Sequence, residues 1–175
     1  MLKVEGLNFY YYRDKEILKD ISFQLNEHDI LCLLGPNGTG KTTLLRCILS
    51  LNKLKKGTIE IDGVDFTKAN VKERAKIMAY VPQATTMAFP YQSFEIVLMG
   101  RIAHLATGRR PTAKDRVIAN EAIERLGVTH LSHKSFNQMS GGEKQMILVA
   151  RALAQQSKIL VMDEPTANLD FSNQI

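Results

Sequence analysis

The feature that most constrains this sequence is the glycine-rich segment GPNGTGKTT at residues 35–43. It fits the pattern G-x-x-x-x-G-K-[ST], in which glycines let successive backbone N–H groups point at phosphate oxygens. The preceding run ILCLL is apolar on both faces and predicts a central parallel strand covered by helices. The following TTLLRCIL predicts a helix, whose N-terminus adds partial positive charge. The sequence therefore predicts a strand, a loop and a helix that together hold nucleotide phosphates.

Residues of this segment and of one further segment supply the chemistry that a bound triphosphate needs. We expect Lys41 to reach the β- and γ-phosphates and the hydroxyl of Thr42 to ligate Mg²⁺. The stretch ILVMDE ends an apolar strand with Asp163 and Glu164, which places both carboxylates at the carboxyl edge of a sheet, beside the phosphate loop. Asp163 is expected to hold Mg²⁺ through water, and Glu164 to orient and polarise the attacking water. The alternative is a solvated acidic turn, which is the commoner role of such acids in an arbitrary protein.

The composition indicates a folded domain in a reducing environment. The chain has 175 residues, 45% of them hydrophobic, and a formal net charge of +5. Its basic residues are scattered among acidic ones, so we expect no nucleic-acid partner. No stretch approaches about 18 consecutive apolar residues and no signal peptide is apparent, so the chain is expected to be soluble by itself. Cys32 and Cys47 are expected to be buried thiols in a cytosol.

The periodicity of the apolar residues predicts strands at both ends of the chain. The opening segment, ILKDISFQL and GTIEIDG alternate, which predicts a small antiparallel sheet with Leu7, Phe9 and Tyr11 on one side. VKERAKI predicts a short helix, IMAYV a strand that ends at Pro82, and KILVM a further buried strand. Residues 83–154 are helical in character.

Three helices are expected in that middle region. SFEIVLMG is expected to begin at Ser93, although the N-cap signal there is weak. The next helix has Thr112 as N-cap and Gly127 as its stop, and the third begins at Ser140, where Glu143 completes a capping box. The chain contains no internal repeat or low-complexity segment.

The segment MSGGEKQ at residues 139–145 indicates a second phosphate site. Small residues precede a helix N-terminus there, and N–H groups at such a position bind anions. One triphosphate need not use both helix starts of a single chain. We therefore hypothesise that the second site serves the nucleotide of another copy, so that ATP lies between two chains. The alternative is an ordinary well-capped helix.

Together these motifs closely resemble an ATP-binding cassette (ABC) protein along the chain as far as Asp170. GPNGTGKTT resembles the family's Walker A motif, Gln83 in YVPQ its Q-loop, MSGGEKQ its signature, ILVMDEP its Walker B motif and ANLD its D-loop. The resemblance implies an α/β fold: a RecA-like P-loop core with an N-terminal antiparallel β subdomain and an α-helical subdomain. In this reading the chain is one cassette domain, with the β subdomain and core at about residues 1–85 and 155–175 and the helical subdomain at about 86–154.

The resemblance also implies the cofactors ATP and Mg²⁺ and a set of site residues. An aromatic residue near the N-terminus is expected to stack on adenine; Tyr11 is favoured over Tyr12, and Tyr10 stays open. The implied nucleotide-binding residues are Tyr11, Tyr12, Gly35, Pro36, Asn37, Gly38, Thr39, Gly40, Lys41, Thr42 and Thr43. The implied catalytic residues are Glu164, Lys41 and Gln83. The implied metal ligands are Thr42, Gln83 and Asp163, and the D-loop residue is Asp170. The residues implied to bind the partner's γ-phosphate are Ser140, Gly141, Gly142 and Glu143.

Some positions depart from the family's pattern. Met139 replaces the usual Leu and Glu143 the commoner Gln, and neither change threatens the resemblance. Family members usually continue to a His that contacts the γ-phosphate, whereas here all four histidines precede the Walker B strand and the sequence ends at Ile175. We therefore expect a C-terminally truncated cassette that binds ATP weakly and hydrolyses it slowly. A non-catalytic nucleotide-binding fragment is the alternative.

Among cassettes, an importer subunit fits best. The spacing leaves no room for a coiled-coil insertion, and neither a second cassette nor membrane helices appear. VPQATTMAFPYQSFEIVLMGRIAHL resembles the Q-loop and following helix of cassettes that serve iron-siderophore, haem, cobalamin and related metal-chelate uptake, with VLMGR its most characteristic part; molybdate also stays open. The resemblance implies three partners: a second, head-to-tail copy, transmembrane permease subunits and, indirectly, a substrate-binding protein. It also implies a cytoplasmic location on the inner face of the plasma membrane.

The apolar residues 87–91 form a turn-rich patch beside Gln83. We interpret this patch as a groove for a coupling helix of the permease. A buried-core role for the same residues is the alternative.

Overall fold

The computed structural model describes residues 1–12, 15–83 and 88–164 of the chain. These residues fall into two compact units, Met1–Asn70 and Val71–Ile175, and each is described by itself. The predicted subdomain boundaries near residues 85 and 154 stay a prediction.

The first unit contains a four-stranded antiparallel sheet in the order β2-β1-β3-β4. The strands are β1 (Leu2–Tyr12), β2 (Lys15–Leu25), β3 (Lys56–Ile61) and β4 (Val64–Asp65). Leu2 lies opposite Leu25 on one side and Ile61 on the other, so apolar residues of three strands share one face. Leu7 and Phe9 are buried as predicted, whereas the third member of the predicted face, Tyr11, is half exposed. The predicted antiparallel sheet is confirmed.

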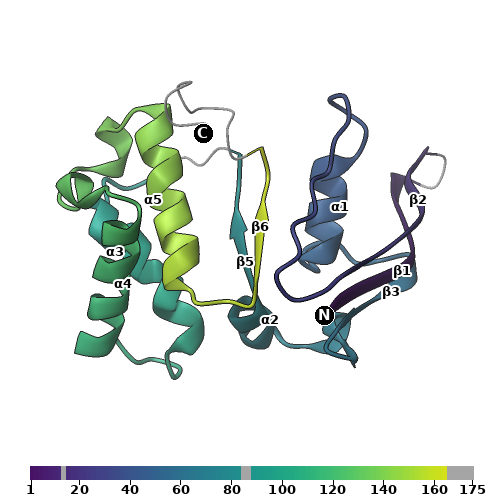
Figure 1. Cartoon of the computed structure of the whole chain (residues 1–175), viewed down its shortest axis with the longest axis horizontal. Coiled ribbons are helices and arrows are strands. Elements are labelled where there is room, and N and C mark those ends of the chain that lie inside the picture. Colours follow the sequence, from purple (N-terminus) through teal and green to yellow (C-terminus); the bar gives the residue numbers. More distant parts are fainter. Residues whose placement is uncertain (13–14, 84–87, 165–175) are drawn as a thin grey trace. The chain divides into compact units, whose positions relative to one another are not determined.

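Helix α1 (Lys41–Ile48) follows the glycine-rich loop and packs on β2 (Figure 1). It buries Leu44, Cys47 and Ile48. Gly40 precedes it with φ +96°, and a Cβ atom there would lie 3.0 Å from Cγ2 of Ile17 on β2. Glycine is therefore required at this position both by its backbone conformation and by the approach to the sheet. A short 3₁₀ helix, η1 (Phe66–Lys68), buries Phe66 against β3.

The apolar run at residues 30–34 is not a strand, which contradicts the prediction of a central parallel strand. Ile30 and Leu34 are 90% and 93% exposed. A strand buried on both faces needs neighbouring strands for its backbone and helices for its side chains. Among the described strands none pairs with this run. Cys32 is exposed for the same reason, so the prediction of a buried thiol is wrong there and confirmed only for Cys47.

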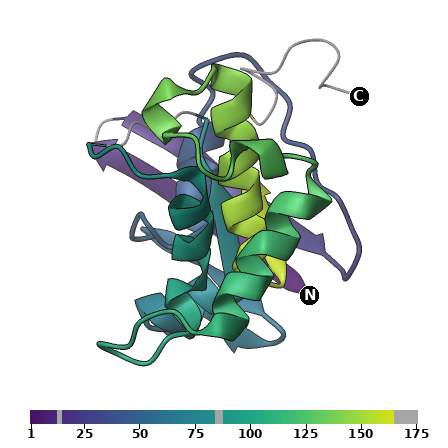
Figure 2. The same cartoon turned by 90° about the vertical axis from the view of Figure 1, so that its left-hand side faces the viewer.

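The second unit packs helices against a parallel pair of strands, β5 (Met78–Val81) and β6 (Ile159–Met162). Its helices are α2 (Val71–Ile77), α3 (Ser93–Met99), η2 (Gly100–His104), α4 (Ala113–Arg125), η3 (Thr129–Leu131), η4 (Phe136–Gln138) and α5 (Gly141–Ala154). Figure 2 shows α4 and α5 side by side on the face turned to the viewer. The core between the helices is formed by residues such as Ile96, Ile123, Phe136, Ile147 and Leu148.

The helix boundaries follow the predicted caps with one shift. Thr112 and Ser140 are N-caps with complete capping boxes, and Gly127 follows α4 with φ +67°. Helix α3 is instead capped one residue earlier, at Gln92, whose N–H donates to Glu95 at 3.0 Å. The position three residues after Gln92 holds the acid, which is the spacing that a capping box requires.

Strand β6 is less buried than predicted. Val161 is buried, whereas Leu160 is 38% exposed. Alternate side chains of a strand point to opposite faces, so this pattern is typical of a strand that is covered on one face.

Candidate nucleotide-binding and catalytic site

The glycine-rich loop of the first unit folds around the ammonium group of Lys41. Its Nζ donates to the carbonyl oxygens of Gly35 at 2.6 Å and Pro36 at 2.9 Å. The hydroxyl of Thr39 also donates to Pro36 O, at 2.9 Å. The loop therefore places a cation at the start of α1, where the helix N-terminus adds its own partial positive charge. This is the electrostatic arrangement that a phosphate-binding loop needs.

Tyr11 lies beside this loop. Its hydroxyl accepts a hydrogen bond from Nδ2 of Asn52 at 3.4 Å. Hydrogen bonding with Thr43, and then with Asn52, lowers the pKa of Tyr11 below its ordinary value. Phe9 meets the ring edge-on, with ring centroids 4.9 Å apart. Thr43 belongs to the first turn of α1, so these contacts hold Tyr11 next to the phosphate loop with half of its surface exposed.

The other two tyrosines are placed differently. Tyr12 is 80% exposed, and the ring of Tyr10 lies under the ammonium group of Lys55 at 5.0 Å. Neither is held against the loop in this way. The geometry therefore favours Tyr11 as the residue that stacks on a base, a role that stays a prediction.

Gln83 and Glu164 meet at the carboxyl ends of β5 and β6 in the second unit. The side-chain amide of Gln83 donates to Oε2 of Glu164. Asp163 N donates to Val81 O at 3.0 Å, which extends the parallel ladder by one residue. The Asp163 carboxylate is buried and accepts a hydrogen bond from the hydroxyl of Tyr80 at 3.3 Å. Strand pairing thus brings three of the predicted site residues to one sheet edge.

Glu164 adopts a left-handed backbone conformation, with φ +48°. This conformation is uncommon for a residue with a side chain and is concentrated at turns and functional sites. Here it accompanies the side-chain contact between Glu164 and Gln83.

The predicted Mg²⁺ ligands are divided between the two units, with Thr42 in the first and Gln83 and Asp163 in the second. A hydroxyl, an amide oxygen and a carboxylate are hard oxygen donors, which suit Mg²⁺. No cluster of three His, Cys, Asp or Glu side chains occurs among the residues that the structure describes. Within the second unit, Gln83 and Asp163 are oxygen donors that suit an ion whose remaining ligands are water and phosphate oxygens. Asp170, the predicted D-loop residue, lies outside the described residues.

The N-terminus of α5 is built by Ser140 and Glu143. The Glu143 carboxylate accepts from Ser140 N at 2.7 Å, and Ser140 Oγ accepts from Glu143 N at 3.2 Å. Lys134 donates to both carboxylate oxygens, at 2.8 and 3.0 Å. Lys134 and then Ser140 lower the pKa of Glu143 to about 2. Glu143 is thus engaged by the cap and by Lys134, while Ser140 and Gly141 are exposed at the helix start.

Sequence reasoning missed Lys134. The available signal was a cation nine residues before the acid that it binds, with the N-cap Ser140 between them.

The characteristic letters VLMGR have a structural explanation. A Cβ atom at Gly100 would lie 2.3 Å from the carbonyl oxygen of Arg151, so glycine permits the close approach of α3 and α5. Arg101 is buried and donates to Asp115 Oδ1 at 3.1 Å and to Ala154 O at 2.7 Å. These two residues join η2 to α4 and to the end of α5.

The apolar patch after the Q-loop is exposed at residues 88–90, whereas Tyr91 is partly buried against the core of the second unit. Phe89 is 65% exposed, and its ring meets that of Tyr91 at a centroid distance of 6.1 Å. Met87 lies outside the described residues. The exposure of Phe89 argues against the buried-core alternative for this residue.

Within the described residues, no helix has both the length and the apolar character to span a membrane.

These features define an α/β protein with a phosphate-binding loop and a separate acidic strand end. The sequence profile of the ABC transporter family matches residues 18–167. The chain therefore belongs to the ABC transporter family and comprises its ATPase domain, in a family whose members generally bind and hydrolyse ATP.

Two curated relatives illustrate the similarity. An uncharacterised ABC transporter ATP-binding protein of Haemophilus influenzae is 44% identical over 94% of this chain and 62% of its own length. A probable iron chelatin transport ATP-binding protein of Helicobacter pylori is 41% identical over 99% of this chain and 68% of its own length. The chain thus spans roughly two thirds of these relatives.

Solved structures agree on the fold. A metal-chelate type ABC transporter in an inward-facing conformation is 39% identical over 99% of this chain and 63% of its own chain, with a TM-score of 0.85. A dimeric ATP-binding cassette bound to ADP and phosphate is 26% identical over 98% of this chain and 77% of its own, with a TM-score of 0.84. The predicted class, a P-loop core with antiparallel β and helical parts, is confirmed.

Proposed function

We propose that this chain binds and hydrolyses ATP as the energy-coupling subunit of an importer for a metal complex, at the cytoplasmic face of a membrane. The observation that carries the proposal is the contact between Gln83 and Glu164 at the ends of two parallel strands. It joins the residue expected to sense the permease to the residue expected to polarise water.

In the proposed reaction, Lys41 and the first turn of α1 bind the phosphates, and Tyr11 stacks on the adenine. Mg²⁺, when bound, neutralises charge on the β- and γ-phosphates. Thr42, Gln83 and Asp163 would hold the ion. Glu164 orients a water molecule for attack on the γ-phosphate and accepts its proton as the new bond to the phosphorus forms. The bond between the γ-phosphorus and the bridging oxygen breaks in the same step, and ADP leaves with the electron pair on that oxygen.

We further propose that a second copy of the chain completes the nucleotide-binding site. The start of α5 presents Ser140 and Gly141 to solvent, and a helix start of this kind binds anions. A relative has been solved as a dimer with ADP and phosphate. ATP binding would then close two cassettes and hydrolysis would release them, which drives the permease between its two orientations.

The metal-complex cargo is supported by the names of relatives that serve iron chelatin, molybdate and manganese transport. The exposed ring of Phe89, which meets the partly buried Tyr91, supports docking of a membrane subunit beside Gln83. Within this group, iron-siderophore, haem and cobalamin are the complexes we would test first.

Nucleotide binding and turnover of the purified chain test the ATPase. Lys41→Ala should abolish binding of fluorescent ATP, whereas Glu164→Gln should retain binding and lose hydrolysis by at least about 100-fold. Equal hydrolysis by the Glu164→Gln variant would overturn the proposed role of the carboxylate. Uptake of labelled iron-siderophore, haem, cobalamin and molybdate by cells with and without the gene tests the cargo.

A further inference from the structure

A tyrosine hydroxyl lies against the carboxylate that the proposed reaction assigns to Mg²⁺. The side chain of Asp163 is buried, and its Oδ2 atom accepts a hydrogen bond from the hydroxyl of Tyr80 at 3.3 Å. A buried carboxylate is costly unless polar groups surround it, so a donor at this distance helps to hold the carboxylate in place. The steps of phosphate binding and water activation proposed above give Tyr80 no part.

The register of β5 and β6 explains how the ring reaches the acid. Figure 1 shows the two strands side by side, and Tyr80 on β5 lies opposite Val161 on β6. Paired residues share a face of a sheet, and so do residues two positions apart on one strand. Tyr80, Val161 and Asp163 therefore lie on one face, and the ring of Tyr80 bridges the diagonal between the strands.

The strand that carries this hydroxyl is held on both sides. Ala79 and Val81, the neighbours of Tyr80, are fully buried, and the side chain of Tyr80 is half-buried. The guanidinium group of Arg151 on α5 donates to Tyr80 O at 3.3 Å. The hydroxyl thus projects from a buried strand, and groups on such elements are placed more accurately than groups on loops.

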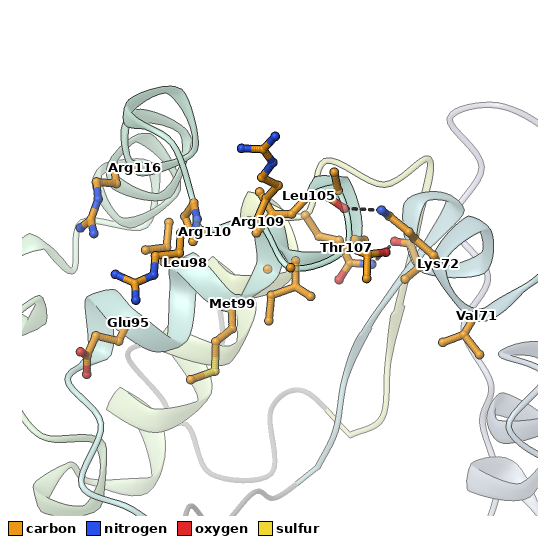
Figure 3. A pocket seen from close by; sticks show the side chains of 18 of the residues that line it. Val71, Lys72, Glu95, Leu98, Met99, Leu105, Thr107, Arg109, Arg110 and Arg116 are labelled. Carbon is orange, nitrogen blue, oxygen red and sulfur yellow. Dashed lines mark hydrogen bonds between the residues drawn. The ribbon is translucent and has the colours of Figure 1, made fainter.

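A separate cavity in the same unit does not account for the pair. It has a volume of about 930 Å³ and lies among α2, α3 and η2, where Figure 3 shows Leu98 and Leu105 on its walls. Its lining includes neither Tyr80 nor Asp163. The contact between these two side chains therefore belongs to the carboxyl edge of the parallel strands.

Each acid at this edge has a donor from the segment that contains β5. Tyr80 donates to Asp163, and Gln83 donates to Glu164. Mg²⁺ demands a nearly ideal octahedral geometry, so a carboxylate that holds it benefits from a fixed orientation. We propose that Tyr80 is a positioning residue, whose hydroxyl keeps Asp163 in the orientation that meets the ion. This inference rests on the proposed function, in which Asp163 is a ligand of Mg²⁺.

Tyr80→Phe tests the hydroxyl, because it keeps the ring and removes the donor. Mn²⁺ replaces Mg²⁺ as a spectroscopic probe, and electron paramagnetic resonance measures its dissociation constant from the full chain with a non-hydrolysable ATP analogue. Loss of a hydrogen bond to a metal ligand weakens metal binding by at least about 10-fold, and we expect a loss of this size. The affinity for fluorescent ATP in EDTA, where no metal is bound, should not change.

The dependence of turnover on Mg²⁺ gives a second readout. In Tyr80→Phe, half-maximal turnover should require about 10-fold more Mg²⁺, whereas the rate at saturating Mg²⁺ should stay within about twofold of the wild type. Damage to the fold would instead lower the rate at every Mg²⁺ concentration. The matched control is Ser157→Ala, which removes a hydroxyl that donates to Ile159 O at 3.0 Å, at the opposite end of β6. This control should leave both readouts unchanged.

A double-mutant cycle tests whether the hydroxyl acts through the acid. Asp163→Asn keeps the shape of the side chain and removes its charge, so it should weaken Mn²⁺ binding by itself. Phosphate oxygens of the nucleotide still hold the ion, which keeps the affinity measurable. Adding Tyr80→Phe to Asp163→Asn should then cause no further loss.

Unchanged Mn²⁺ affinity in Tyr80→Phe would overturn the inference, as would an equal loss when Tyr80→Phe is added to Asp163→Asn. Weaker ATP binding in EDTA, or a fall in turnover at every Mg²⁺ concentration, would also overturn it by assigning Tyr80 to the fold. These results remove this inference alone if Asp163→Asn weakens Mn²⁺ binding. If Asp163→Asn leaves the Mn²⁺ affinity unchanged, the proposed role of Asp163 as a metal ligand fails as well.

Discussion

The side-chain amide of Gln83 donates a hydrogen bond to the carboxylate of Glu164, and the two residues follow neighbouring parallel strands. Gln83→Ala should remove this support and leave Glu164 free to rotate. We expect the turnover number to fall about 10-fold, the effect of roughly 1.4 kcal/mol in the activation barrier, with little change in ATP affinity.

Steady-state ATP hydrolysis and fluorescent-ATP binding check this expectation. Gln138→Ala, at an exposed glutamine of the same unit, is the matched control and should behave like the wild type. A Gln83→Ala variant with unchanged turnover would show that the contact does not position Glu164.

Tyr11 is held against α1 by Thr43 and Asn52, while Tyr12 points to solvent. Tyr11→Ala should weaken ATP binding about fivefold, because an aromatic contact contributes about 1 kcal/mol. Tyr11→Phe should retain most of the affinity, since stacking needs only the ring. Tyr12→Ala is the control and should leave the dissociation constant unchanged. Loss of affinity in Tyr12→Ala but not in Tyr11→Ala would reverse the assignment.

The pKa of Glu143 is held at about 2 by Lys134 and by the N–H group of Ser140. Because the folded-state pKa lies below the ordinary 4.5, the carboxylate stabilises the fold above that value. This contribution is lost as the pH falls from about 4.5 towards about 2. Lys134→Met should raise the pKa of Glu143, although the Ser140 hydrogen bond should keep it below the ordinary value.

Carbon-detected NMR titration of the Glu143 carboxyl group measures this pKa directly. Lys114→Met removes an exposed lysine from α4 and provides the control. An identical Glu143 titration in wild type and Lys134→Met would refute the role of Lys134.

Arg101 and Asp115 form a buried ion pair with a distance of 3.1 Å between Nε and Oδ1. Asp115→Asn keeps the shape of the side chain but leaves the guanidinium charge without its partner. We expect the free energy of unfolding to fall by about 3 kcal/mol. Urea denaturation checks the value, with Glu121→Gln, at an exposed acid of α4, as the control. A loss of unfolding free energy no larger than that of the control would mean that the ion pair does not stabilise the fold.

Local signals predicted much of this fold. The antiparallel strands followed from alternation, and Thr112 and Ser140 were identified as caps because the acid three residues later is visible in the sequence. The sequence predicted that Gln83 and Glu164 each follow a strand, but it did not predict that the two side chains meet. Their hydrogen bond depends on the parallel register of β5 and β6, which no local pattern contains.

Each failure has its own physical cause. The run at residues 30–34 has the composition of a buried strand, but composition does not supply the neighbours that a strand needs. Lys134 was missed because its role depends on an ion pair with Glu143 that forms across a turn. The cap of α3 was displaced by one residue because a glutamine at that position gives a weaker sequence signal than Ser93.

Gly100 and Arg101 belong to the most characteristic letters of the resemblance to metal-chelate cassettes, and both act in the packing of helices against each other. Neither takes part in nucleotide chemistry in this structure. Both residues are explained by the way in which η2 packs against α4 and α5. These letters therefore describe the scaffold of the second unit, and they carry no chemical information about a cargo.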